Sequence, residues 1–271
     1  VWLVEDHSLP VVTMNFSFEG GLINDPAEKP GVAKMVSILL DEGAGELRSQ
    51  AFQSQLSNNA ISLSFTPGRD AFHGTLKTVT KHRDTAFNLL QLALTQPRFD
   101  NDAVERMRDA NLASIRDDMG NPAWLSARTF NGMVFEGHYY ALPGAGTLES
   151  VPRITRRDLV DFVKTQFTRD GLRISIVGDI SKEDASALID KTFASLPASG
   201  PAATTAKPAD IQHVGKTISL PLDTPQTYIA TALPAVARND ADWHAVVVMN
   251  YILGGGSFDA RLMREVREKR G

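Results

Sequence analysis

The stretch Pro30-Gly-Val-Ala-Lys-Met-Val-Ser-Ile-Leu-Leu-Asp-Glu-Gly43 decides how this chain is expected to fold. Its apolar residues follow the i, i+3, i+4, i+7, i+8 spacing that buries one face of a helix: Val32, Met35, Val36, Leu39 and Leu40. Gly43 is a typical residue to end such a helix. The sequence therefore predicts a buried helix over residues 32–40.

Strands and helices are predicted on both sides of this helix. The strands are 9–18, ending at Gly20-Gly21, then 60–65 and 72–78 around the turn Pro67-Gly68, and the β-branched run 172–178. The helices are 49–58, 84–95, 102–117, 122–135, one that starts after Thr155 as its N-cap, and 181–196. Because these elements show no strict βαβ rhythm, we expect an α+β fold with a mainly antiparallel sheet.

Two domains are predicted. Residues 197–210 are rich in Pro, Ala, Ser and Thr, which is typical of a linker. We expect an N-terminal α+β domain at 1–197, a linker at 198–213, and the start of a second, similar α+β domain at 214–271. That second domain would hold strands at 216–222 and 227–232 and a helix at 242–253. About sixty residues are too few to close a core, so we expect its C-terminal part to be missing from this chain.

Composition excludes several functions. Lys and Arg number 28 against 32 Asp and Glu, so a basic nucleic-acid surface is not expected. There is no cysteine, which removes disulfides, thiolate nucleophiles and Cys-based zinc sites, and fits an oxidising compartment. No apolar run approaches the ~18 residues of a membrane helix. The chain opens inside a predicted strand (Val1–Val4), so both ends look trimmed and targeting information is expected to be absent.

Histidine spacing gives no local metal site. The chain has 6 histidines, and no two of them lie close enough to form a His-x-x-x-His pair: His7, His73, His82, His138, His213 and His244. A metal site would have to assemble from distant segments. Each histidine is therefore interpreted as a surface or core residue.

The loop Gly254-Gly-Gly-Ser-Phe258 has two interpretations. It is not a phosphate loop, because no Gly-Lys-Ser/Thr follows, and Asp259 breaks the Gly-x-Ser-x-Gly pattern of a nucleophile elbow. It either connects two helices, with Ser257 capping the second near Phe258, or it presents bare backbone to a peptide.

Six segments appear in the order known from one peptidase family. They are Val4-Glu-Asp-His-Ser-Leu-Pro-Val-Val12, Gly20-Gly-Leu-Ile-Asn-Asp25, the stretch 30–43, His138-Tyr-Tyr-Ala-Leu-Pro143, Ile176-Val-Gly-Asp-Ile180 and Leu253-Gly-Gly-Gly-Ser-Phe-Asp-Ala-Arg-Leu-Met-Arg-Glu-Val-Arg-Glu-Lys-Arg-Gly271. Together they resemble the family of pitrilysin, insulin-degrading enzyme and the mitochondrial processing peptidase. The last block is the most specific.

The resemblance implies that the zinc motif has been lost. Active members carry His-x-x-Glu-His on the helix that corresponds to residues 32–40 and a third ligand, a glutamate, on a later helix. The matching positions are Lys34 and Ile38 for the two histidines, Ser37 for the general base and Ser114 for the third ligand. A cation, a hydroxyl, a hydrocarbon and a second hydroxyl neither hold zinc nor deprotonate its water. No cofactor is therefore expected in this chain.

Other features of the family pattern are kept. Related proteases place an Arg across the cavity from zinc to orient substrate and stabilise its oxyanion, and the matching residue is Arg267. Residues 254–258 match a substrate-contacting loop of the non-catalytic processing-peptidase subunit. The resemblance thus implies a non-catalytic, substrate-binding or regulatory subunit, inactive alone. A homologous zinc-carrying partner would complete a heterodimeric endopeptidase that degrades peptides in a closed chamber.

Two alternatives stay open at this point. One is a structural assembly subunit resembling the core proteins of a respiratory complex, with no role in proteolysis. The other is an active enzyme with a relocated metal site. For the leading hypothesis we expect the periplasm, with the mitochondrial matrix as the alternative, and peptides as ligands.

Overall fold

The computed structural model describes residues 1–200, 208–256 and 258–271. The chain divides into an N-terminal unit, Val1–Tyr228, and a C-terminal unit, Ile229–Gly271. Each unit is described by itself. The domain boundaries expected from the sequence, 1–197, 198–213 and 214–271, stay a prediction.

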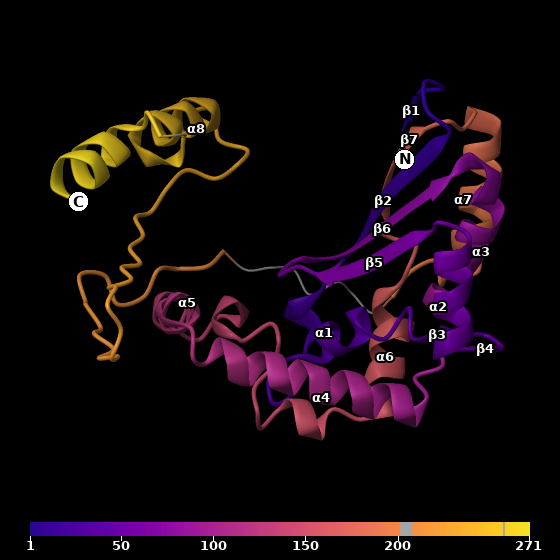
Figure 1. Ribbon diagram of the computed structural model, residues 1–271, viewed down its shortest axis with the longest axis horizontal. Coiled ribbons are helices and arrows are strands. Elements are labelled where there is room, and N and C mark those ends of the chain that lie inside the picture. Colours follow the sequence, from indigo (N-terminus) through magenta and orange to yellow (C-terminus); the bar gives the residue numbers. More distant parts are fainter. Residues whose placement is uncertain (201–207, 257) are drawn as a thin grey trace. The chain divides into compact units, whose positions relative to one another are not determined.

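The N-terminal unit is built on a five-stranded sheet (Figure 1). Its strands, in the order β1-β7-β2-β6-β5, are β1 (Trp2–Glu5), β7 (Arg173–Gly178), β2 (Val11–Glu19), β6 (Ala71–Val79) and β5 (Ser62–Pro67). All neighbours pair antiparallel except β1 and β7, which are parallel. β2 and β6 alternate buried and outward residues because successive side chains of a strand point to opposite faces.

The described residues of this unit form seven α-helices: α1 (Val32–Ser37), α2 (Ser49–Asn58), α3 (Arg83–Thr95), α4 (Asn101–Asp118), α5 (Pro122–Val134), α6 (Arg156–Gln166) and α7 (Lys182–Phe193). A short β-hairpin follows α1 and consists of β3 (Gly43–Ala44) and β4 (Leu47–Arg48), each two residues long. Short 3₁₀ turns are η1 (Leu22–Asn24), η2 (Thr80–His82), η3 (Tyr139–Ala141) and η4 (Val151–Arg153). The predicted N-cap is confirmed, because Thr155 and Asp158 form a capping box at the start of α6.

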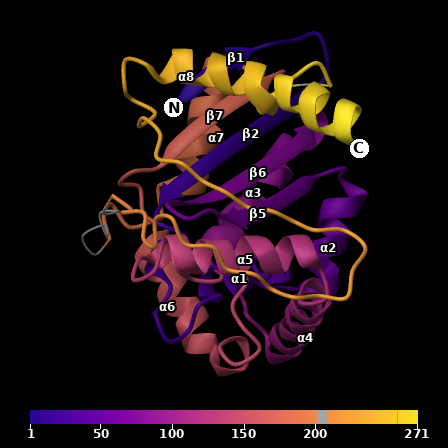
Figure 2. The same cartoon turned by 90° about the vertical axis from the view of Figure 1, so that its left-hand side faces the viewer.

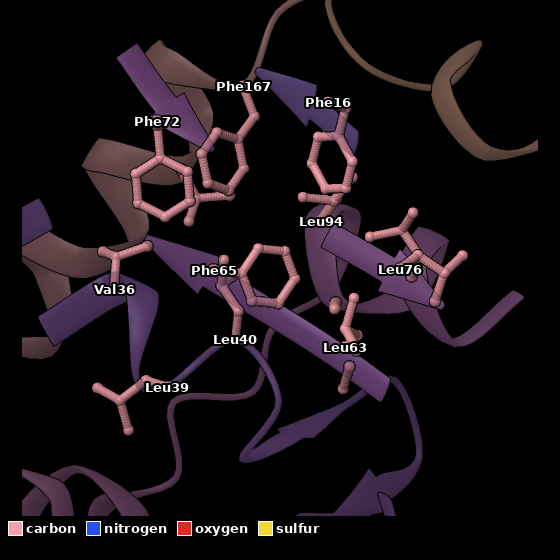
Figure 3. Packing of buried hydrophobic residues seen from close by; sticks show 14 of the residues in the cluster. Phe16, Val36, Leu39, Leu40, Leu63, Phe65, Phe72, Leu76, Leu94 and Phe167 are labelled. Atoms are coloured by element: carbon pink, nitrogen blue, oxygen red, sulfur yellow. The ribbon is translucent and has the colours of Figure 1, made fainter. Parts of the chain in front are cut away.

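The core lies between one face of the sheet and the helices. α1 packs against β5 and α6, and α3 packs against β6 and α7. Figure 3 shows Leu40, in the segment after α1, beside Phe65 of the sheet. The rings of Phe16 and Phe65 lie 6.3 Å apart, and those of Phe72 and Phe167 5.1 Å apart. Such edge-on and tilted pairs are the arrangements that aromatic rings favour.

The opposite face of the sheet carries mostly polar outward residues. Within the N-terminal unit, Asn15, His73, Lys77 and Ser64 are exposed on neighbouring strands. Figure 2 looks onto the sheet from this side, with α3 and α7 behind it. The prediction of an α+β fold with a mainly antiparallel sheet packed with helices is confirmed.

The C-terminal unit is helical where it is regular. It contains α8 (Trp243–Asn250), which continues into the π-helical turn η5 (Tyr251–Gly255), and a second π-helical turn, η6 (Met263–Glu268). The strands predicted at 216–222 and 227–232 are wrong, since these residues have no regular structure. A strand is stabilised by hydrogen bonds to a neighbour, and the described residues offer these two segments no pairing strand.

Candidate functional site

The helix α1 opens to solvent at two positions. Of residues 31–40, only Lys34 and Ile38 are not buried. They are four residues apart, so they share one face of the helix. The family resemblance predicts these two positions to be those of the histidine ligands in active members. We call this opening the α1 window, consisting of Lys34 and Ile38.

A buried carboxylate holds the start of α1 in place. Asp25 accepts hydrogen bonds from the backbone N–H of Gly31 and of Ala33, each at 2.7 Å. These N–H groups have no partner inside the helix, and the carboxylate satisfies them. Burial raises the pKa of Asp25 to about 6. Gly31 has φ +105°, and a Cβ there would lie 2.9 Å from the Cα of Gly146, so a glycine is required.

The residues at the motif positions do not fit a zinc ion. The Ser37 hydroxyl is buried and donates a 2.8 Å hydrogen bond to the carbonyl of Lys34. Ile38 is a hydrocarbon packed against the core. The Lys34 ammonium has no acceptor in the part of the chain that the structure describes. The positively charged Lys34, the hydrogen-bonded hydroxyl of Ser37 and the hydrocarbon side chain of Ile38 supply no ligand to Zn²⁺. These residues therefore support no catalytic step through zinc.

The helix α4 packs against α1 and carries Ser114, the residue that the resemblance matches to the third zinc ligand. Ser114 is exposed on α4. One turn earlier, Asn111 is buried, and its side-chain amide donates to the carbonyl of Ala145 at 2.9 Å. Asn111 thus ties α4 to the loop that surrounds the start of α1. Sequence reasoning missed it, because a single Asn within a helix gives no distinctive signal.

The described residues contain no cluster of three or more His, Cys, Asp or Glu that could hold a metal ion. Instead, two of the six histidines pair with carboxylates, and His7 has two such partners, Asp179 and, at 3.8 Å, Glu5. His7 Nδ1 lies 2.7 Å from Asp179, and His213 contacts Glu136. In 1–200, 208–256 and 258–271, no helix is long and apolar enough to cross a bilayer.

The strand β5 forms one edge of the sheet next to α1. In the described residues, its backbone bonds only to β6, so the outward N–H and C=O groups of alternate residues are unpaired. An unpaired edge is a template for another extended chain. Sequence patterns predicted a strand here but not its place at the edge, which depends on long-range pairing.

A cluster of phenols fixes the tip of the β5–β6 hairpin. The hydroxyls of Tyr139 and Tyr140 both donate to the carboxylate of Asp70, the latter at 2.6 Å. The guanidinium of Arg69 lies 4.8 Å from the ring centre of Tyr140 and donates to its carbonyl. Burial and the neighbouring carboxylate raise the pKa of both phenols. The hairpin that ends in β5 is therefore anchored at its tip.

Two predicted site residues meet in the C-terminal unit. The guanidinium of Arg267 lies 5.5 Å from the ring centre of Phe258, and both side chains are exposed. A cation over an aromatic ring at this distance contributes about 0.5–1 kcal/mol at an exposed site. Ser257, predicted to cap the following helix, lies outside the described residues.

The glycines beside Phe258 are closely packed. Gly254 and Gly255 belong to η5 rather than to an open loop, and Gly256 follows it. A Cβ on Gly255 would lie 2.6 Å from the Asn250 amide, and one on Gly256 would lie 2.7 Å from the Tyr251 carbonyl. The glycines therefore allow the chain to turn tightly after α8.

An apolar hollow of about 710 Å³ adjoins these glycines within the C-terminal unit. It is lined by Val248, Met249, Ile252 and Arg261, among others. The first three are exposed, and α8, whose sequence is mostly apolar, has no buried residue. The C-terminal unit thus presents apolar surface next to the predicted site residues.

The α+β unit exposes α1 at Lys34 and Ile38, the two positions matched to zinc ligands, and neither side chain can bind zinc. These features define the class of zinc-peptidase-like proteins that lack the zinc site. The sequence model of "Insulinase (Peptidase family M16)" matches residues 1–131, and that of the "Peptidase M16 inactive domain" matches residues 153–271. The chain belongs to peptidase family M16 and is a non-catalytic member of it.

Three similar proteins illustrate the family. The "Non-peptidase homolog YmxG" of Helicobacter pylori is 26% identical over 98% of this chain and 61% of that protein. The mitochondrial-processing peptidase subunit beta of Neurospora crassa is 24% identical over 89% of this chain and 52% of that protein. The crystal structure of a peptidase M16 inactive domain from Pseudomonas fluorescens matches with a TM-score of 0.85 and 27% identity, over 99% of this chain and 65% of that one. The chain thus spans about half to two thirds of these relatives.

Proposed function

We propose that this protein is the non-catalytic, substrate-binding subunit of a heterodimeric zinc metalloendopeptidase. A homologous partner subunit carries the zinc, and the two subunits enclose peptides in a closed chamber. The observation that carries the proposal is the α1 window on a helix that packs against the edge strand β5. Lys34 and Ile38 supply no zinc ligand, whereas the edge of β5 still offers backbone groups to an extended peptide.

The geometry of β5 supports peptide binding. An extended peptide that adds to a sheet edge gains main-chain hydrogen bonds without regard to its sequence. β5 is packed against α1, and its hairpin tip is anchored through Asp70. A peptide on this edge would therefore lie against a rigid strand, which lowers the entropic cost of binding.

The C-terminal unit is proposed to act on the partner's active site. Arg267 supplies a positive charge for the oxyanion that forms in the partner, and residues 254–258 contact the substrate. Support comes from the contact of Arg267 with Phe258, which places a cation and an aromatic ring on the same exposed surface. Preorganised cations of this kind act on charge that develops in the transition state.

The relatives support a subunit role. One similar protein is described as a non-peptidase homologue, and others as beta subunits of the mitochondrial processing peptidase. We propose the bacterial periplasm as the compartment, on the basis of the absence of cysteine. Fractionation of cells that express the intact protein tests this location.

Hydrolysis of a quenched fluorescent peptide library tests the function. The intact protein, its partner and their mixture are assayed separately, with zinc measured in each. We expect hydrolysis that a chelator abolishes, much faster in the mixture than with the partner alone, and zinc in the partner only. Chelator-sensitive hydrolysis by this protein alone would contradict the proposal. A partner that is equally active without it would favour the structural assembly role.

A further inference from the structure

The α1 window presents one charge and one apolar side chain. Lys34 is half-buried on the helix, and Ile38 lies one turn further along the same face. The remaining residues of 31–40 are buried, and the Ser37 hydroxyl is bonded inside the helix. Whatever contacts α1 from solvent therefore meets the Lys34 ammonium.

No carboxylate of the described chain neutralises this ammonium. Of the four acidic residues within ten positions of Lys34, Glu28 is exposed and forms no ion pair in the described residues, and the other three have partners of their own. Asp25 binds the start of α1, Asp41 accepts a hydrogen bond from Gln53 at 3.1 Å, and Glu42 contacts Ser49 and Arg106. An ammonium that is partly removed from water interacts more strongly with an anion than a fully exposed one does.

We propose that Lys34 is a carboxylate-binding site for the peptide that docks on β5. The site gives the subunit a preference for anionic peptides, and this inference rests on the proposed function. The carboxylate comes from an Asp or Glu side chain or from the C-terminus of the peptide. The four-carbon stem of lysine and its three rotatable donors accommodate either source.

The site keeps a positive charge where active members of the family hold zinc, but the charge cannot activate water. A lysine ammonium donates hydrogen bonds and does not generate hydroxide at neutral pH. The bound peptide is thus held by its carboxylate and left uncut at this position. The site therefore binds the anionic part of the peptide and does not cleave it.

Fluorescence anisotropy with three labelled peptides of equal length tests the site. The first carries one Glu and an amidated C-terminus, the second is neutral with a free C-terminus, and the third is neutral and amidated. Each is titrated with the intact protein in the absence of the partner. The proteins are the unmodified form, Lys34→Met, Lys34→Arg and Lys164→Met, where Lys164 is an exposed lysine on α6.

We expect the first or the second peptide to bind about tenfold more tightly than the third, as for one hydrogen bond to a charged group. The preferred peptide identifies the source of the carboxylate. The preference should weaken with salt, vanish in Lys34→Met, and persist in Lys34→Arg and Lys164→Met. Equal binding of all three peptides, or a preference that survives Lys34→Met in a folded protein, overturns the carboxylate site alone. Absence of binding by every peptide overturns the proposed function as well.

Discussion

The hydroxyl of Ser37 donates its hydrogen bond to the carbonyl of Lys34, at 2.8 Å. The residue that the family resemblance matches to the general base is thus bonded to the residue that it matches to the first zinc ligand. Serine hydroxyls within helices commonly bond to a carbonyl one turn back. The bond keeps this hydroxyl inside α1, away from any molecule at the window.

Restoring the four motif residues should create a zinc site. We expect the combined variant Lys34→His, Ser37→Glu, Ile38→His and Ser114→Glu to retain about one zinc per chain after dialysis. Two histidines at i and i+4 point to the same side of a helix and complete a site with a third ligand. Elemental analysis measures the zinc, with the unmodified protein and the Ser37→Glu variant as controls. A folded combined variant without zinc would show that the correspondence of these positions is wrong.

The buried carboxylate of Asp25 should make stability fall as the pH rises. Burial raises the pKa of Asp25 to about 6, from 3.8 for an unperturbed aspartate. Between these values the folded protein keeps a proton that the unfolded chain releases. This contribution to the free energy of unfolding is therefore complete below about pH 4 and lost as the pH passes 6, a change of about 3 kcal/mol.

Urea unfolding at pH 4 to 7 measures this effect. Asp25→Asn removes the titration and keeps one acceptor oxygen for the start of α1. We expect the unmodified protein to lose stability relative to this variant as the pH rises. Parallel stability curves for the two proteins would contradict the assignment.

Two glycines should respond in opposite ways to alanine. A Cβ on Gly74 would lie 2.0 Å from the Phe16 ring on the neighbouring strand, whereas one on Gly132 in α5 meets nothing within 4 Å. Gly74→Ala should lower the free energy of unfolding by about 1–3 kcal/mol, because the ring must leave its position. Gly132→Ala should raise it by about 0.5–1 kcal/mol through helix propensity. Urea titration monitored by circular dichroism compares them, and equal effects would show that Phe16 moves freely.

Arg267, the exposed cation of the C-terminal unit, should raise the rate of peptide hydrolysis by this protein mixed with its partner. Arg267→Ala is expected to lower kcat about 10²-fold, as for loss of one preorganised donor to an oxyanion. Arg264→Ala, an exposed arginine of the same helical segment, serves as the matched control. Peptide hydrolysis by the mixture with the partner measures both variants. Unchanged turnover with Arg267→Ala would remove this residue from the mechanism.

Sequence patterns predicted those helices and caps that depend only on residues close together in the chain. The helix at 49–58 has the predicted bounds, and Thr155 caps α6 through a contact only three residues away. The helix predicted at 32–40 is shorter, ending at Ser37 and continuing in tight turns such as the bond from Leu39 N–H to the Val36 carbonyl. Apolar spacing alone does not distinguish a helix from a buried succession of turns.

Features of the site that depend on distant residues could not be predicted from spacing. The α1 window was found only by matching family motifs, since Lys34 and Ile38 carry no pattern of their own. The anchoring of Tyr139 and Tyr140 by Asp70 joins segments about 70 residues apart. The edge position of β5 depends on pairings made elsewhere in the sheet.

The place of β7 in the sheet has a consequence for synthesis on the ribosome. β7 lies between β1 and β2, pairing with strands that precede it by more than 150 residues. Until residue 178 has left the exit tunnel, β2 keeps one side unpaired and β1 has no neighbour. A nascent chain in which β6 has emerged and β7 has not would expose the unpaired side of β2 to other chains. Chaperone demand during translation should therefore be greatest between the emergence of β6 and that of β7.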